Sequence, residues 1–258
     1  MPLLGLGVYD MYKAEAEQAV EDALAIGYRL IDTASMYENE VEIGNAIKNA
    51  GLDRKEIFLT TKLNNTDHGY EAALKAFDDS LKKLGQDYVD LYLIHWPIKE
   101  GRAASWKGLE KLYAEKRVKA IGVANYNIAL LEELKTTASI VPAVNQIEFS
   151  PWLYQEDLLA YCKAAGIQVQ SYSPITRGLK FSDERLVLIC NKYNRTPAQI
   201  VLNWHLQHGI STIPKSSKKE RLVENFDATS FTLSNEDVKI MNGFNENFRI
   251  CDDPQTYL

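Results

Sequence analysis

Residues 89–97 read Val89-Asp90-Leu91-Tyr92-Leu93-Ile94-His95-Trp96-Pro97, a strand-like run that turns polar at its C-terminal end. Two earlier runs share this character: Tyr28-Arg29-Leu30-Ile31-Asp32-Thr33 and Ile57-Phe58-Leu59-Thr60-Thr61-Lys62-Leu63. Each is mostly apolar, with β-branched or aromatic side chains, before the polar end. Catalytic groups gather at the C-terminal ends of strands in parallel sheets and barrels. The three runs therefore predict a functional site at one rim of a parallel sheet.

Strand-like and helix-like segments alternate along the rest of the chain. The other predicted strands are Leu3–Tyr9, Ala120–Asn125, Ala143–Glu148, Gln168–Ser173 and Ser211–Lys215. The amphipathic stretches between strands are Lys13–Ile26, Glu40–Ala50, Tyr70–Leu84, Ala104–Lys116, Ile128–Thr137, Gln155–Ala165, Ala198–His208 and Lys218–Asp227. Eight strands with helical crossovers predict an α/β protein with a (β/α)8 TIM barrel.

Helix-capping residues predict one or two helices in addition to those of the barrel. An extra helical segment, Asp183–Asn194, precedes the Thr196-Pro197 start of the next helix, and Ser234 caps a short helix near the C-terminus. The length of 258 residues is close to that of one barrel, so residues 1–258 are expected to form a single domain. The first predicted strand begins at Leu3, so we expect no capping element before it.

Composition excludes several classes of function. A net charge of -6 and a pI of about 5.4 argue against nucleic-acid or anionic-membrane binding. No apolar run approaches the ~20 residues of a membrane span, and the N-terminus lacks the features of a signal peptide. Three widely spaced cysteines form no metal-binding pattern and fit a reduced, cytoplasmic setting. His205 and His208 lie on one predicted helix, but we expect surface or packing roles and no metal site.

An acid, a phenol, an ammonium and an imidazole are predicted to meet at the rim. Asp32 can pair with Lys62, and Lys62 can face the Tyr37 hydroxyl, whose reference pKa is ~10. A nearby ammonium favours phenolate and so lowers the pKa of the tyrosine, which makes it a better acid. His95, as a neutral imidazole, can donate a hydrogen bond to a substrate oxygen and orient it.

The alternative is a structural ion pair between Asp32 and Lys62, with Tyr37 and His95 as hydrogen-bonded neighbours. For any one of these residues alone, the structural interpretation is the better one. Charges at the ends of consecutive buried strands are costly unless they are paired, and they usually serve a purpose. The four residues together therefore favour catalytic proton transfer.

The segments that contain these four residues resemble those of a known family. The segments Asp32-Thr33-Ala34-Ser35-Met36-Tyr37-Glu38-Asn39-Glu40, Thr61-Lys62-Leu63 and Leu93-Ile94-His95-Trp96-Pro97 are similar to catalytic segments of the aldo-keto reductases. The resemblance, to short-loop microbial aldehyde and keto-sugar reductases, extends from Leu3 to about Phe248. It implies an NADPH-dependent oxidoreductase on a barrel, with Tyr37 as proton donor and Asp32, Lys62 and His95 as its partners.

The nicotinamide end of a cofactor site is expected at later strand ends. Gly5-Leu6-Gly7 lacks the third glycine of a dinucleotide fingerprint and lies in the first predicted strand. The resemblance implies that Asn125 and Gln146 bind the carboxamide and that Tyr172 lies under the ring. Ala124 stands where the family usually has serine, so one hydroxyl is missing, at a cost of ~1 kcal/mol in binding.

The phosphate end is expected after the eighth strand. Basic residues at a helix N-terminus oppose the helix dipole, and a bound phosphate resolves that conflict. The resemblance implies that Lys215, Ser216 and Arg221 surround an adenosine 2′-phosphate, with Glu224 and Asn225 near the adenine. No acidic residue is evident to take a ribose 2′-hydroxyl, so NADPH is expected over NADH.

Tyr9, Trp96 and His95 are expected to face the substrate. Trp152 is a further candidate, with packing of the Ser150-Pro151-Trp152 loop as the alternative. The loops Ile98–Ala103 and Pro174–Phe181 and the tail after Phe248 are short, which suggests an open pocket. Small aldehydes, α-dicarbonyls and keto-sugars fit such a pocket. The enzyme is expected to be a monomer, the family default.

Two alternatives stay open. The first is alcohol oxidation in vivo, because cofactor ratios decide the direction. The second is a cofactor-binding regulatory or structural protein on the same barrel, since potassium-channel β-subunits and some lens crystallins resemble reductases.

Overall fold

The computed structural model describes residues 1–257, in which eight strands form one parallel sheet in chain order. The strands are β1 (Leu6–Gly7), β2 (Leu30–Asp32), β3 (Phe58–Leu63), β4 (Val89–Ile94), β5 (Val118–Ala124), β6 (Val144–Glu148), β7 (Gln168–Tyr172) and β8 (Ser211–Thr212). All eight predicted strands are present. β1 and β8 are only two residues long, shorter than predicted.

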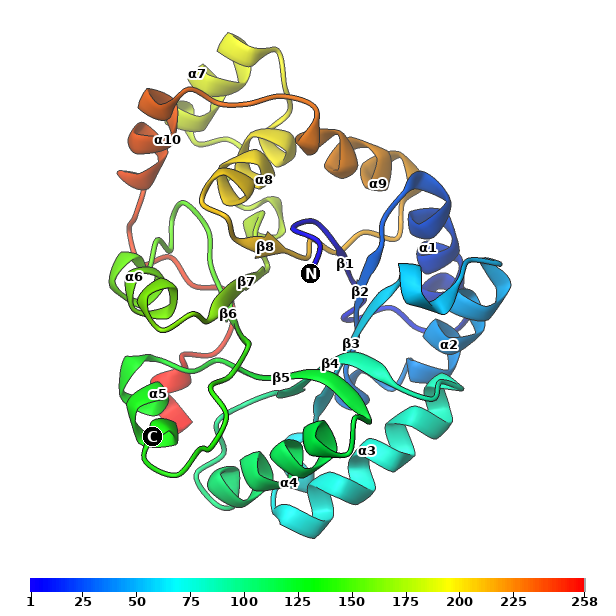
Figure 1. Ribbon diagram of the computed structural model, residues 1–258. Coiled ribbons are helices and arrows are strands. Elements are labelled where there is room, and N and C mark those ends of the chain that lie inside the picture. The colour runs from blue at the N-terminus through cyan, green and yellow to red at the C-terminus, as the bar shows by residue number, and fades with distance from the viewer. Residues whose placement is uncertain (258) are drawn as a thin grey trace.

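Helices surround the curled sheet, as Figure 1 shows in a view along its axis. They are α1 (Lys13–Ile26), α2 (Glu40–Asn49), α3 (Tyr70–Leu84), α4 (Arg102–Ala114), α5 (Ile128–Lys135), α6 (Glu156–Ala164), α7 (Glu184–Tyr193), α8 (Pro197–Gln207), α9 (Lys219–Phe226) and α10 (Asn235–Asn242). α7 and α10 are the expected additions. Thr196 caps α8 through a capping box and Ser234 caps α10, which confirms both predicted helix starts.

The two ends of the strand ladder, β1 and β8, approach each other. The ladder itself does not continue from β8 to β1, so by strand pairing the sheet is open. One parallel bridge joins Leu4 to Thr212, and the Gly5 amide donates to the Thr212 carbonyl over 2.9 Å. A side chain at Gly7 would place its Cβ 2.8 Å from the Ile213 carbonyl oxygen. The glycines of Gly5-Leu6-Gly7 therefore permit a close backbone approach.

The apolar core lies between the sheet and the helices. One continuous cluster of buried side chains extends from Leu4 to Phe244, and Leu91, Leu93, Ala124 and Val144 form a smaller cluster. Fully buried rings such as Trp106 and Phe77 belong to the large cluster. Strands held in such a core present their last residues at one common rim.

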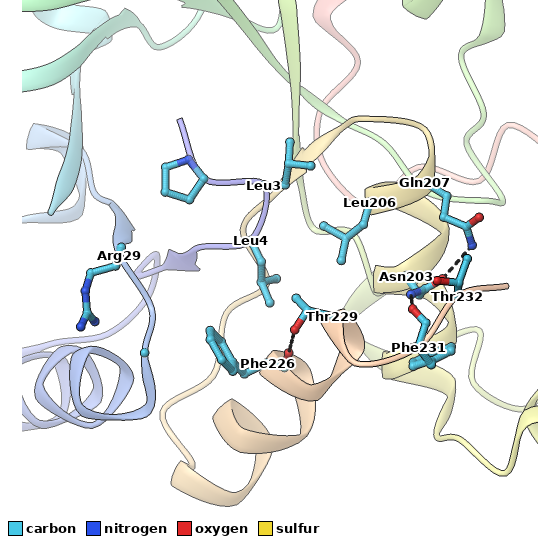
Figure 2. Close-up of a pocket in the computed structure, with 12 residues that line it drawn as sticks. Leu3, Leu4, Arg29, Asn203, Leu206, Gln207, Phe226, Thr229, Phe231 and Thr232 are labelled. Atoms are coloured by element: carbon cyan, nitrogen blue, oxygen red, sulfur yellow. Dashed lines mark hydrogen bonds between the residues drawn. The ribbon is translucent and has the colours of Figure 1, made fainter. Parts of the chain in front are cut away.

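A cavity of about 550 Å³ lies at the opposite rim, where the strands begin. Figure 2 shows its apolar lining, which includes Leu3, Leu4, Leu206 and Phe226. Leu3 and Leu4 precede β1, and Phe226 ends α9. None of the predicted catalytic or cofactor-binding residues lines this cavity, so it is not the site indicated by the sequence.

The close packing of α2 on α3 can be tested at Gly44. A Cβ at this position would lie 2.2 Å from the Leu84 carbonyl oxygen, so Gly44→Ala must push the helices apart. We expect a loss of about 1–3 kcal/mol in the free energy of unfolding, measured by urea denaturation. Asn45→Ala, at an exposed position of the same helix, is the control and should change stability little. Equal stability of both variants would mean that the helices do not pack this closely.

Candidate active site

A buried ion pair forms the centre of the site. Lys62 on β3 is fully buried and Asp32 at the end of β2 is 1% exposed. The Lys62 ammonium donates to Asp32 Oδ1 and, over 2.8 Å, to the Thr33 carbonyl. Burial raises the pKa of the Asp32 carboxyl and lowers that of the Lys62 ammonium, while their mutual attraction opposes both shifts. Each charge thus depends on the other to stay in the core.

Tyr37 and His95 complete the group that the sequence predicted. Tyr37 ends a short 3-10 helix, Ser35–Tyr37, that follows β2, and its hydroxyl is 3.4 Å from Lys62 Nζ. The same hydroxyl is 3.5 Å from Nε2 of His95, which follows β4. The structure therefore brings Asp32, Lys62, Tyr37 and His95 together at the C-terminal rim.

The pKa of Tyr37 differs in direction from the sequence-based expectation. Burial, and then the Asp32 carboxylate, raise the pKa of Tyr37 well above its usual range. The sequence predicted that Lys62 lowers the pKa of Tyr37. The cost of removing water from the phenolate outweighs the attraction of the Lys62 ammonium, because that ammonium is already paired with Asp32. Tyr37 is consequently a neutral phenol at pH 7, the form that can give up a proton.

His95 is neutral as well. Burial, and then the Lys62 charge, hold the pKa of His95 well below its usual range. Its Nδ1 is buried and has no hydrogen-bond partner within residues 1–257. A neutral imidazole carries one N–H, so His95 can donate to only one oxygen at a time.

Gln146 on β6 connects the ion pair to the neighbouring strand β7 through hydrogen bonds. Its amide nitrogen donates to Asp32 Oδ2 and to Gln170 Oε1, both over 2.7 Å. Gln170, on β7, in turn donates to Ser211 over 3.2 Å. The two acceptors fix which way the Gln146 amide faces, because only its nitrogen can donate to both. The sequence interpretation did not include Gln170, which lies mid-strand.

Asn125 and Tyr172 lie side by side at the neighbouring strand ends. Tyr172 donates from its hydroxyl to Asn125 Oδ1 over 2.7 Å, and Asn125 Nδ2 donates to the His95 carbonyl over 2.9 Å. Asn125 adopts a positive φ of 66°, a conformation that asparagine tolerates better than most residues. Asn125, Gln146 and Tyr172 thus border the same rim as the catalytic candidates.

The predicted phosphate-binding residues lie around the start of α9. Lys215 and Arg221 are exposed, and no carboxylate within residues 1–257 forms an ion pair with either. Ser216 is buried and its hydroxyl accepts from the Lys218 amide over 3.1 Å. Glu224 is half-buried and Asn225 is buried on the same helix.

Two of the three aromatic candidates for substrate contact border the site. Tyr9 is exposed and its ring lies edge-on to Tyr37, with 5.2 Å between ring centroids. Trp96 is half-buried and lies 5.0 Å from the ring of Tyr257. Trp152 is fully buried and donates to Asp183 over 2.7 Å, so it packs the core. Of the two expectations for Trp152, packing is confirmed and substrate contact is wrong, because the ring is buried and its indole N–H already has a partner.

His205 and His208 have packing roles, one of the two roles expected for them. Both ring nitrogens of His205 lie within 3.0 Å of a backbone carbonyl oxygen, and burial lowers its pKa to about 4. His208 Nε2 bonds to Asn242 over 2.9 Å. No group of three potential metal ligands occurs within the part of the chain that the structure describes.

The described helices include none long and apolar enough to cross a bilayer.

Comparisons with known proteins agree with this geometry. The model of the aldo/keto reductase family matches residues 4–246. A glyoxal reductase of Bacillus subtilis is 46% identical over 100% of this chain and 94% of its own length. The methylglyoxal reductase DkgA of Escherichia coli K12 is 41% identical over the same shares of the two chains. A substituted form of Gox0644, solved in complex with NADPH, superposes with a TM-score of 0.94 at 39% identity, covering 99% of this chain and 94% of its own.

This chain therefore belongs to the aldo-keto reductase family. It is an oxidoreductase that uses a nicotinamide cofactor.

The role of Tyr37 can be separated from cofactor binding. Tyr37→Phe removes only the hydroxyl, so we expect kcat for carbonyl reduction to fall on the order of 10²–10⁴-fold. The dissociation constant for NADPH, measured by quenching of protein fluorescence, should stay within about twofold of wild type. Tyr113→Phe is the control, since this tyrosine is exposed near the end of α4 and is not among the residues of the candidate site. Turnover retained in Tyr37→Phe would remove Tyr37 from the acid role.

Proposed function

We propose that this protein reduces aldehydes, α-dicarbonyls or keto-sugars with NADPH and that Tyr37 is the general acid. One observation carries this proposal: the Tyr37 hydroxyl lies 3.4 Å from Lys62 Nζ and 3.5 Å from His95 Nε2. A carbonyl oxygen placed beside that hydroxyl would meet two donors and a nearby positive charge. Such an arrangement stabilises the negative charge that develops on oxygen during reduction.

Each residue has a distinct task in this mechanism. NADPH, when bound, supplies the hydride. Tyr37 gives its proton to the substrate oxygen, and the Lys62 ammonium stabilises the phenolate that remains. Asp32 keeps Lys62 charged and in place. His95 donates its single N–H to the carbonyl oxygen and so orients the substrate.

The residues present fit a nicotinamide cofactor with a 2′-phosphate. The donor set at the start of α9 supports this assignment, because Lys215 and Arg221 are exposed cations without a carboxylate partner within residues 1–257. Ser216 adds a hydroxyl, and Glu224 and Asn225 would contact the adenine. At the other end, Asn125 and Gln146 would hold the carboxamide and Tyr172 would pack against the ring.

The substrate class follows from the pocket and the relatives. Tyr9, Trp96 and His95 would contact a carbonyl compound at the rim, and short surrounding loops leave room for small molecules. The B. subtilis and E. coli relatives are named for glyoxal and methylglyoxal, both α-dicarbonyls. We infer the same class here.

Further properties belong to the same proposal. We infer a single domain over residues 1–258, supported by one continuous apolar cluster. The Leu4–Thr212 bridge supports a closed (β/α)8 barrel. We propose that the protein is monomeric and that it is located in the cytoplasm. Alcohol oxidation in vivo and a cofactor-binding regulatory role stay as alternatives.

A reduction assay tests the proposed activity. Methylglyoxal, glyoxal, a small aldehyde and a keto-sugar are offered with NADPH or NADH, and loss of the reduced cofactor is followed at 340 nm. We expect turnover that depends on the carbonyl and favours NADPH. Tight NADPH binding without turnover on any of these compounds would favour the regulatory alternative.

The cofactor preference depends on Arg221. Arg221→Ala removes a charge near the proposed 2′-phosphate, so KM for NADPH should rise at least tenfold and KM for NADH should change less than twofold. Lys239→Ala is the control, because Lys239 lies on α10, which Figure 1 shows apart from α9. An equal loss with both cofactors would mean that Arg221 does not contact the 2′-phosphate.

A further inference from the structure

The C-terminal tail, residues 246–257, crosses the rim that carries the candidate active site. Figure 1 shows this red segment leaving α10, passing α6 and ending beside α5. The Trp152 carbonyl accepts from the amides of Glu246 and Phe248 over 3.1 and 3.0 Å, which fixes the first part of the tail. The rest of the tail meets side chains from the ends of β4, β6 and β7.

Glu148, the last residue of β6, holds the middle of the tail. Its side chain is buried, with 3% of the residue exposed. Oε1 accepts from the Ile250 amide over 2.7 Å and Oε2 accepts from the Cys251 amide over 3.0 Å. The Arg249 guanidinium is 3.9 Å from Oε2. Both carboxylate oxygens are therefore committed to the tail, and a buried carboxylate is costly without such partners.

Beyond this clamp, the tail contacts the candidate active site. The Cys251 thiol lies 4.0 Å from Ser173 Oγ, directly after β7 and next to Tyr172. Further on, the Tyr257 ring lies 5.0 Å from that of Trp96, at an interplanar angle of 32°. Arg102 donates to the Tyr257 carbonyl over 3.4 Å and to the Pro97 carbonyl over 3.0 Å. The same guanidinium thus links the tail to the segment that follows His95.

We propose that Glu148 is a positioning residue that holds the C-terminal tail over the carbonyl site and thereby sets the KM for the carbonyl substrate. Glu148 acts through the tail and does not take part in proton transfer. Its two hydrogen bonds fix residues 250 and 251, so that Cys251 borders Ser173 at the end of β7 and Tyr257 can rest on Trp96. This inference rests on the proposed reductase function.

Steady-state kinetics of Glu148→Ala test the proposal. Loss of both acceptors should free the tail and raise KM for methylglyoxal at least tenfold, because two charge-assisted hydrogen bonds are lost. kcat and the NADPH dissociation constant should stay within about threefold of wild type. Glu156→Ala, an exposed glutamate at the start of α6, is the matched control and should change nothing. A wild-type KM in Glu148→Ala would overturn the proposal, as would an equal loss in kcat.

Glu148→Gln keeps the volume of the side chain and one acceptor, so it tests the clamp even if the alanine variant does not fold. We expect a smaller rise in KM for methylglyoxal and faster hydrogen exchange in a peptide covering residues 245–257. Wild-type exchange in that peptide would contradict the clamp. Hydrogen exchange can be measured without turnover. A wild-type protein that shows no reduction would therefore refute the reductase function. The hydrogen-exchange result would still decide whether Glu148 holds the tail.

Discussion

The ion pair between Asp32 and Lys62 is the constraint on which the candidate site depends. A lone charge in this core would be costly, and the two charges persist because each satisfies the other. The adjacent strands β2 and β3 supply one member each, so the curled sheet sets their separation. Tyr37 and His95 are placed around the Lys62 ammonium, and Gln146 accounts for the second oxygen of Asp32. The register of the strands in the parallel sheet thus brings the side chains of the candidate site together.

The same carboxylate links the proposed acid–base group to the proposed nicotinamide contacts. Gln146 donates to Asp32, and Gln170 accepts from Gln146, so the orientation of this amide is fixed from two sides. Asn125 and Tyr172 bond to each other at the next strand ends. Residues proposed to bind the cofactor are therefore ordered by the protein itself. Such preorganisation lowers the cost of ordering these groups when a ligand binds.

Much of this arrangement could be predicted from the sequence, because strand periodicity and polar strand ends are local signals. The eight strands and the grouping of Asp32, Lys62, Tyr37 and His95 follow from them. Three features could not be predicted in this way. The raised pKa of Tyr37 depends on burial, the buried place of Trp152 depends on a bond to Asp183, and Glu148 meets residues about a hundred positions later in the chain. These are long-range contacts without a sequence pattern.

The pH profile of kcat for Asp32→Asn, compared with wild type, tests most directly whether Asp32 keeps Lys62 charged. Burial alone lowers the pKa of Lys62, and Asp32 opposes that shift. Removing the carboxylate should lower the pKa of Lys62 further. Activity that needs the ammonium is present below this pKa and is lost as pH rises through it. We therefore expect the alkaline limb of the profile to move to lower pH in Asp32→Asn, with activity partly recovered toward pH 6. A profile that coincides with that of wild type would contradict the account.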